Sequence, residues 1–103
     1  MGFSRLRKKA MKDARITVVK AQLALSIARI IESRGLSQIQ AAQIIGLSQP
    51  KLSDMINGKF RGISEAKMLE CIIRLGRDIR IVIHPNEGPE NRPGHIEICM
   101  GSQ

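Results

Sequence analysis

The sequence predicts a small, mainly α-helical domain that ends in a short β-strand or hairpin. Between about residues 17 and 76, serines at helix starts and glycines at helix ends recur in register. After that stretch Ile79, Ile81 and Ile83 alternate with other side chains, which is typical of a strand. A chain of 103 residues fits one domain, and the spacing of these signals predicts four or five helices.

The net charge is high and unevenly distributed along the chain. Lys and Arg number 17 against 9 Asp and Glu, which gives +8. Residues 1–34 hold 9 basic and 2 acidic side chains, whereas residues 63–103 hold 5 and 6. A basic chain of this size indicates a polyanionic partner, with nucleic acid first. Only Phe3 and Phe60 are aromatic, which argues against single-strand binders that stack bases on aromatic rings.

Composition and motifs exclude several function classes. The chain has no apolar run long enough for a membrane span and no secretion signal, so we expect no membrane contact. Two cysteines are too few for a disulfide framework, which favours the cytoplasm, in association with the nucleoid. We expect neither catalysis nor a cofactor, because paired carboxylates, an activated nucleophile and a phosphate-binding glycine loop are absent. We expect no metal site, because the spacing of Cys71, His84, His95 and Cys99 matches no familiar zinc-binding pattern.

The first helix is expected from about Val18. Leu23, Ile27 and Ile30 recur at helical spacing, and Gly35 ends the pattern. Residues 1–16 lack a clear period, so we expect a basic arm that is disordered when unbound, or helical only towards its end.

Three further helices follow, each begun by a serine and ended by a glycine. Gln40 stands three residues after Ser37 and completes a capping box. Pro50 falls in the first turn of the next helix, where its missing N–H costs nothing. The expected starts are Ser37, Ser48 and Ser64, and the expected ends are Gly46, Gly58 and Gly76.

The remaining residues complete the expected fold. Residues 85–94 contain three prolines and two glycines and are expected to form a loop, and residues 95–100 alternate again as a second strand. The expected core consists of Leu23, Ile27, Ile30, Ile31, Leu36, Ile39, Ala42, Ile45, Leu47, Leu52, Met55, Ile56, Leu69, Ile72 and Ile73.

Two of the short helices form a recognisable pair between Ser37 and Lys59. About three residues separate them, and Ala42 is small where two crossing helices approach closely. Gly46 supplies the positive φ that the turn needs. This pattern indicates a helix-turn-helix, whose second helix at residues 49–57 enters the major groove of DNA.

Here the chain resembles the Xre/Cro-type helix-turn-helix regulators, in the short branch that includes HigA-like antitoxins. The resemblance covers residues 20–84 and implies a lambda-repressor-like bundle. We therefore divide the chain into an arm (1–16), a DNA-binding domain (17–76) and a C-terminal part for dimerisation (77–103). The matching segments are Gly35–Gln38, Ala41–Ala42, Gly46–Ser53, Asn57–Lys59 and Leu75–Ile83.

The first turn of the recognition helix supplies the expected base contacts. Gln49 can pair with adenine and Lys51 can donate to guanine, while Pro50 offers apolar contact. Asp54 either accepts from cytosine or stays in solvent. The resemblance also implies that Gln49 reads a base. It implies further that Gln38 contacts a phosphate and braces Gln49. The expected contacts to the DNA backbone are Gln38, Ser48, Ser53, Asn57, Lys59 and Arg61.

These features predict a sequence-specific regulator of double-stranded DNA, an autorepressor that binds as a homodimer. Ile79, Ile81 and Ile83 are expected to form the dimer contact, the alternative being a monomer whose strand packs on its own helices. The alternative function is an antitoxin that neutralises a small ribonuclease toxin through protein–protein contact. In that case residues 1–15 are the first candidate for the contact, whereas in a plain repressor they would bind DNA phosphate.

Overall fold

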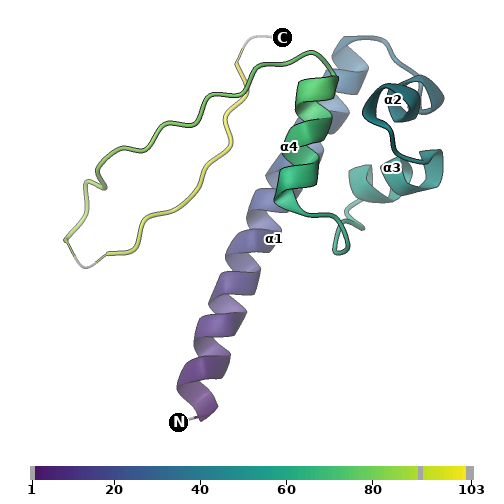
Figure 1. Ribbon diagram of the computed structural model, residues 1–103. Helices are drawn as coiled ribbons and strands as arrows, with labels where there is room; N and C mark the ends of the chain where they lie inside the picture. Colours follow the sequence, from purple (N-terminus) through teal and green to yellow (C-terminus); the bar gives the residue numbers. More distant parts are fainter. Residues whose placement is uncertain (1, 91, 102–103) are drawn as a thin grey trace.

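The computed structural model describes residues 2–90 and 92–101, with side chains described from Ile16 onward. In this part of the chain four helices form: α1 (Gly2–Ser33), α2 (Gln38–Ile45), α3 (Gln49–Ile56) and α4 (Glu65–Arg74). The C-terminal half of α1 lies beside α4, and α2 and α3 lie together at one side of this pair (Figure 1). The prediction of a mainly α-helical fold is confirmed. None of the described helices has the length and apolar character of a membrane span.

Serine side chains begin α2, α3 and α4, as the sequence predicts. At Ser37 the capping box is complete: its Oγ accepts from the Gln40 N–H at 3.1 Å, and its own N–H donates to Gln40 Oε1 at 2.9 Å. Ser48 and Ser64 each accept from the N–H three residues later, at 3.3 and 3.1 Å. Each cap satisfies a helix N–H that has no partner inside the helix, so these starts are determined locally.

The predicted glycine ends are also confirmed, and each has the same hydrogen-bonded turn. At Gly46 the backbone has φ +81°, and the Leu47 N–H donates to the Ala42 carbonyl five residues back at 3.1 Å. Only glycine adopts this conformation without strain between Cβ and the backbone. The other helices end in the same way at Gly35, Gly58 and Gly76.

The core lies between the C-terminal half of α1, the buried faces of α2 and α3, and α4. Leu36, Leu47, Ile56 and Leu69 are half-buried at its edge. The predicted residues that are fully buried are Leu23, Ile27, Ile30, Ile31, Ala42, Ile45, Leu52, Met55 and Ile72.

Two predicted core residues are wrong, because the buried stripe of each helix has a different phase. Ile73 is 60% exposed, since α4 buries Met68, Cys71 and Leu75 at i, i+3 and i+7. Ile39 is 57% exposed, because α2 buries the face of Ala41, Ala42 and Ile45, and Ile39 lies about a third of a turn around the helix from the middle of that face. Ala24 and Leu75, which belong to the apolar stripes expected for the first and fourth helices, are also buried, and the sequence analysis missed the buried residues Ala41, Ile63, Met68 and Cys71.

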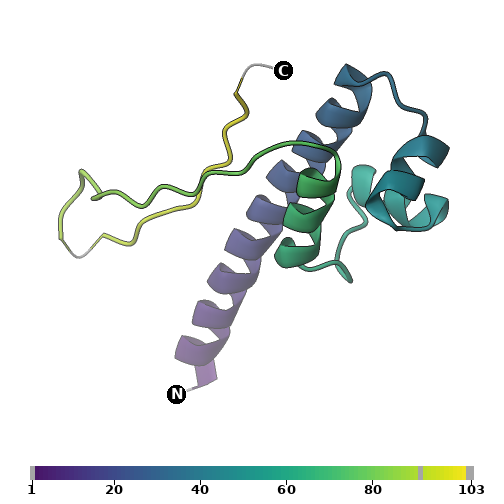
Figure 2. The same cartoon turned by 45° about the horizontal axis from the view of Figure 1, so that its top comes forward.

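The N-terminal segment differs from the expected disordered arm. The backbone of residues 2–15 is helical and continuous with the rest of α1. No glycine or proline occurs between Phe3 and Arg34, so nothing in the sequence ends the helix within that stretch. This half of α1 projects beyond the other helices (Figures 1 and 2).

The predicted C-terminal strands are wrong for the described part of the chain, which contains no strand. Residues 77–90 leave α4 in an extended path, and residues 92–101 return towards α1 (Figure 2). The turn is held by Asn86 Nδ2, which donates to the Arg92 carbonyl at 3.1 Å, and the return by the Ile98 N–H, which donates to Gln22 Oε1 at 3.3 Å. Beyond the turn, where the Arg92 N–H donates to the Pro89 carbonyl, the described residues of the two extended segments exchange no backbone hydrogen bond, and a ladder needs two backbones in register.

The crossing of α2 with its neighbours can be tested at Ala42, which is 5% exposed. We expect Ala42→Arg to lower the free energy of unfolding by on the order of 3 kcal/mol or more, because a cation would enter a packed interface without a partner. Thermal or urea denaturation followed by circular dichroism measures this. Gln43→Arg, at the exposed neighbouring position, is the control that should melt like the wild type; equal melting of both variants would contradict the core assignment.

Candidate nucleic-acid interface

A side chain of α4 binds the backbone at the turn between α2 and α3. Arg74 Nη1 donates to the Ile45 carbonyl at 3.3 Å, while its Nη2 lies 3.0 Å from Glu70 Oε1. A Cβ atom at Gly46 would lie 2.9 Å from Arg74 Nη1. Gly46 is therefore required by its positive φ, whereas the guanidinium, at the end of a flexible side chain, could move away from a Cβ atom. The cation also lies at the C-terminal end of α2, where the helix dipole favours positive charge.

Helix α3 buries one face and exposes the other. Leu52 and Met55 are fully buried in the core. Pro50, Asp54 and Asn57, at i, i+4 and i+7, are exposed on the opposite face. The short α2 thus positions α3 with its outer face in solvent.

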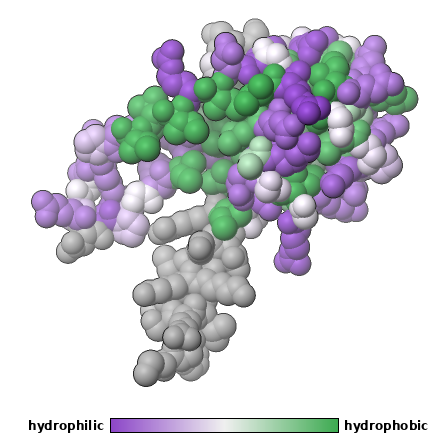
Figure 3. All heavy atoms as spheres, viewed as in Figure 1, coloured by the Kyte–Doolittle hydropathy of each residue, from purple (hydrophilic) through white to green (hydrophobic). Residues whose placement is uncertain are grey.

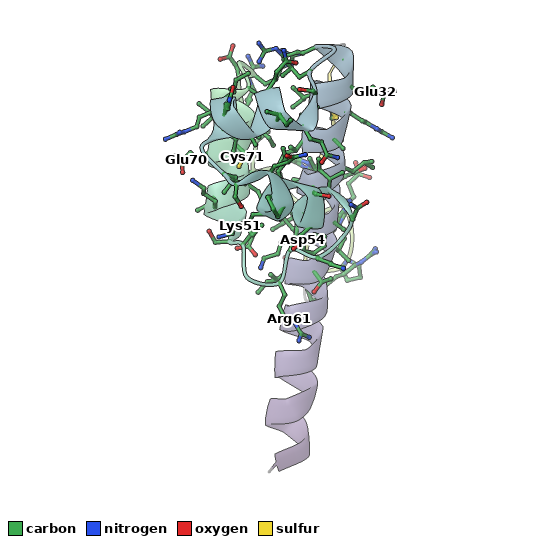
Figure 4. All side chains as sticks on the ribbon, turned by 90° about the vertical axis from the view of Figure 1, so that its right-hand side faces the viewer. Glu32, Lys51, Asp54, Arg61, Glu70 and Cys71 are labelled. Carbon is green, nitrogen blue, oxygen red and sulfur yellow. The ribbon has the colours of Figure 1, made fainter. Side chains whose placement is uncertain are left out.

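The first turn of α3 brings the predicted base-contacting residues together. Gln49, Pro50 and Lys51 are consecutive exposed residues there, and Asp54 follows one turn later. Lys51 and Asp54 lie on the same edge of α3, with Arg61 beyond them in the next loop (Figure 4). Neither Lys51 nor Asp54 belongs to an ion pair within the described residues. Both charges therefore face solvent.

Two residues predicted to contact the DNA backbone already have roles in the helix. The Ser48 hydroxyl accepts from the Lys51 N–H, which leaves its own proton available to donate to a phosphate oxygen. Asn57 Nδ2 donates to the Ser53 carbonyl at 2.8 Å and lies 3.4 Å from Ser53 Oγ. The Asn57 side chain thereby closes the last turn of α3, and Ser53 is half-buried beneath it.

The loop after α3 presents two further predicted phosphate contacts, Lys59 and Arg61, which are both exposed. Lys20 of α1 donates from Nζ to the Arg61 carbonyl at 3.3 Å. The sequence analysis missed Lys20, because it precedes Arg61 by 41 residues and no local signal joins them. This hydrogen bond places the loop beside α1.

Gln38 is exposed at the first residue of α2. This position leaves its side chain available to a phosphate at the edge of the motif. Among the described residues its side chain forms no hydrogen bond with that of Gln49, so the bracing role stays a prediction.

The predicted dimerisation residues lie apart from α3, in the extended C-terminal segment. Ile79, Ile81 and Ile83 are 37, 76 and 94% exposed. Figure 3 shows apolar residues gathered along this segment and over the neighbouring part of the bundle. The structure therefore separates an apolar surface from the polar outer face of α3.

The two cysteines lie in different environments. Cys71 is fully buried in α4, and burial raises the pKa of its thiol, whereas Cys99 is exposed. Within the described residues, no three His, Cys, Asp or Glu side chains form a group that could hold a metal ion.

The chain is similar to known helix-turn-helix proteins in sequence and in fold. A family model described as a helix-turn-helix domain matches residues 7–84. A solved structure, of a protein named as a transcriptional regulator of the XRE family, is 31% identical. The match covers 86% of this chain and 99% of that one, with a TM-score of 0.77. No curated protein matches the sequence.

Proposed function

We propose that this chain, which belongs to the XRE family of helix-turn-helix DNA-binding transcriptional regulators, is an autorepressor that reads its operator with the first turn of α3. The exposed face of α3 is the observation that supports this most directly. Its first turn carries Gln49 and Lys51, which match base edges in the major groove. The buried face with Leu52 and Met55 holds the helix rigidly for that task.

Contacts on both sides of α3 support the same docking. Gln38 and Ser48 stand at the amino ends of α2 and α3, where helix N–H groups and the dipole favour phosphate. Lys59 and Arg61 follow at its carboxyl end, beyond the Asn57 side chain that closes the helix, and supply donors for a second stretch of DNA backbone. Contacts of this kind position the helix, while the side chains of its first turn provide specificity.

A dimer is proposed because one such motif contacts only a few base pairs. Residues 78–84 form no hydrogen bond with the backbone of another described residue, so their N–H and C=O groups remain available. Ile81 and Ile83 are largely exposed, which does not support packing of this segment on its own helices. Pairing with the same segment of a second copy would satisfy those groups and bury the isoleucines.

A second candidate function is that of an antitoxin. It is favoured by an exposed apolar patch on α1, where Val18 and Leu25 are 53 and 52% exposed at i and i+7. This patch is suited to a protein partner rather than to DNA.

Co-expression of the chain with the products of neighbouring reading frames tests the antitoxin function. Relief of growth inhibition by the wild-type chain, and loss of that relief in Leu25→Lys, would support an antitoxin.

Two substitutions separate base reading from backbone binding. We expect Gln49→Ala to weaken binding to the cognate site by about 1–3 kcal/mol and to relax specificity there. Lys59→Ala should weaken binding to all duplexes alike and reduce the slope of log K against log salt by about 1. Fluorescence anisotropy with the upstream region of the gene and a random duplex measures both. Identical behaviour of the two variants on the two duplexes would contradict the assignment.

The dimer can be tested at Ile81. We expect Ile81→Lys to give monomers in sedimentation equilibrium, because a desolvated cation at the strand pairing would oppose association. Leu25→Lys adds the same charge at an exposed apolar residue of α1 and should leave the dimer intact. A dimer that persists in Ile81→Lys but is lost in Leu25→Lys would move the interface to α1.

A further inference from the structure

The turn between α2 and α3 is short enough to couple the two helices. Only Gly46 and Leu47 separate Ile45, the last residue of α2, from Ser48, the N-cap of α3. The first turn of α3 follows at once, with the Gln49 side chain that we propose reads a base. A small rotation of the backbone at Ile45 therefore displaces the side chains of that first turn.

The Arg74 guanidinium of α4 binds two groups at once. Its Nη1 donates to the Ile45 carbonyl at 3.3 Å, and its Nη2 lies 3.0 Å from Oε1 of Glu70, one helical turn earlier in α4. A Cβ atom at Gly46 would lie 2.9 Å from Nη1, so the guanidinium lies directly against the backbone of the turn. The planar fork of arginine allows this double contact, which the single ammonium of lysine does not reproduce.

The Glu70 carboxylate that orients Arg74 is shared with a second cation. Lys67 Nζ lies 3.5 Å from Glu70 Oε2, whereas Oε1 faces Arg74. A glutamate four residues before a basic residue is a favourable pair on a helix. Lys67 is thus joined to the same carboxylate as Arg74, but among the described residues its side chain forms no hydrogen bond with α2.

The core contacts of the two short helices are apolar. Ala41, Ala42 and Ile45 of α2 and Leu52 and Met55 of α3 are buried. Burial of apolar surface has no preferred direction, whereas a hydrogen bond weakens steeply when its angle changes. The contact from Arg74 is therefore suited to set the angle of the turn, while the core holds the helices in place.

We propose that Arg74, oriented by Glu70, is a positioning residue that sets the angle at which α3 enters the major groove, and with it the sequence specificity of the chain. This inference rests on the proposed reading of bases by the first turn of α3. Base contacts depend on the placement of each donor and acceptor, whereas contacts to phosphates are largely electrostatic and independent of sequence. Loss of the Arg74 contact should weaken binding to cognate DNA more than binding to random DNA.

The surroundings of Arg74 favour this role over a direct contact with DNA. The described contacts of its two Nη atoms are to the Ile45 carbonyl and the Glu70 carboxylate. A phosphate placed there would be repelled by that carboxylate and by the negative C-terminal end of the α2 dipole. Phosphates are instead favoured at helix N-termini such as those that follow Ser37 and Ser48.

The test compares single variants of the full chain. Arg74→Met removes the guanidinium, Arg74→Lys keeps the charge without the fork, and Glu70→Gln removes the orienting carboxylate. Lys67→Met is the matched control, because it removes the same charge from the same helix at a side chain that shares Glu70. Binding is measured at a temperature at which circular dichroism shows the variants to be folded. Arg74→Lys and Glu70→Gln keep the test decisive if Arg74→Met does not fold.

The specific probe is the duplex that the wild-type chain enriches from a random-sequence pool, and a random duplex of the same length is the reference. Fluorescence anisotropy over a salt series gives the ratio of the two affinities and the slope of log K against log salt. We expect Arg74→Met to lower the ratio about three- to tenfold for each bound copy, which corresponds to one hydrogen bond of ordinary strength, and to leave the slope unchanged. Arg74→Lys and Glu70→Gln should lower the ratio as well, whereas Lys67→Met should not.

A double variant checks that Arg74 acts through the base contact. In the Gln49→Ala background, we expect Arg74→Met to lower the ratio less than it does in the wild type, because the contact that it positions is already lost. Equal losses in the two backgrounds would overturn the inference.

Three further outcomes also overturn the positioning role and leave the recognition helix standing. The first is an unchanged ratio in Arg74→Met with a slope reduced by about 0.9, which would show a direct phosphate contact. The second is a wild-type ratio in Arg74→Lys, and the third is an equal ratio in Arg74→Met and Lys67→Met. If the wild-type chain enriches no duplex, sequence-specific reading by α3 is itself overturned, and the inference that rests on it falls with it.

Discussion

Burial of the apolar stripe of α1 against α4 is the interaction on which the rest of the structure depends. Ile27 and Ile30 from α1 and Met68 and Leu75 from α4 are almost completely removed from solvent. Each buried side chain of this size contributes about 1.5–3 kcal/mol relative to exposure. The two helices of the helix-turn-helix have only eight residues each, which is too short to be stable alone in water. They form because the α1–α4 pair provides the surface that they cover.

Two arginine side chains connect neighbouring helices at their C-terminal ends. Arg34, just beyond α1, donates to the Leu75 carbonyl at the end of α4 at 3.0 Å. Arg74 in turn donates to the Ile45 carbonyl at the end of α2. Both guanidinium groups satisfy carbonyls that a helix leaves without internal partners. The orientation of α2, and with it the exposed face of α3, is thereby linked to the α1–α4 pair.

The distribution of charge around this core agrees with the division of labour that we propose. The outer face of α3 carries the polar side chains that we propose contact the bases, and the loop with Lys59 and Arg61 adds cations at the end of this helix. The loop is joined to α1 at Lys20, from where the basic half of the helix projects. The apolar residues of the extended segment, such as Ile81 and Ile83, lie elsewhere. DNA and protein partners are thus assigned to separate surfaces of a small domain.

The features that depend on neighbouring residues are predictable from the amino-acid sequence alone. Helix starts at Ser37, Ser48 and Ser64, and the positive φ at Gly46, follow from hydrogen bonds and sterics within a few residues, and the structure confirms them. The helical period also predicts the exposed face of α3, because it places Pro50 and Asp54 opposite the buried Leu52 and Met55. The same motif carries the resemblance to the family, and the family model matches residues 7–84.

The features that depend on distant partners are set by tertiary contacts between the helices. Ile73 is exposed and Leu75 buried because α1 selects which stripe of α4 it covers, which the apolar residues of α4 alone leave ambiguous. Alternation at Ile79–Ile83 is necessary for a strand but not sufficient, because a ladder needs a second backbone in register. The hydrogen bond between Lys20 and the Arg61 carbonyl joins residues 41 positions apart. Local propensity contains no information about such a contact, which exists only once the core has brought the loop to α1.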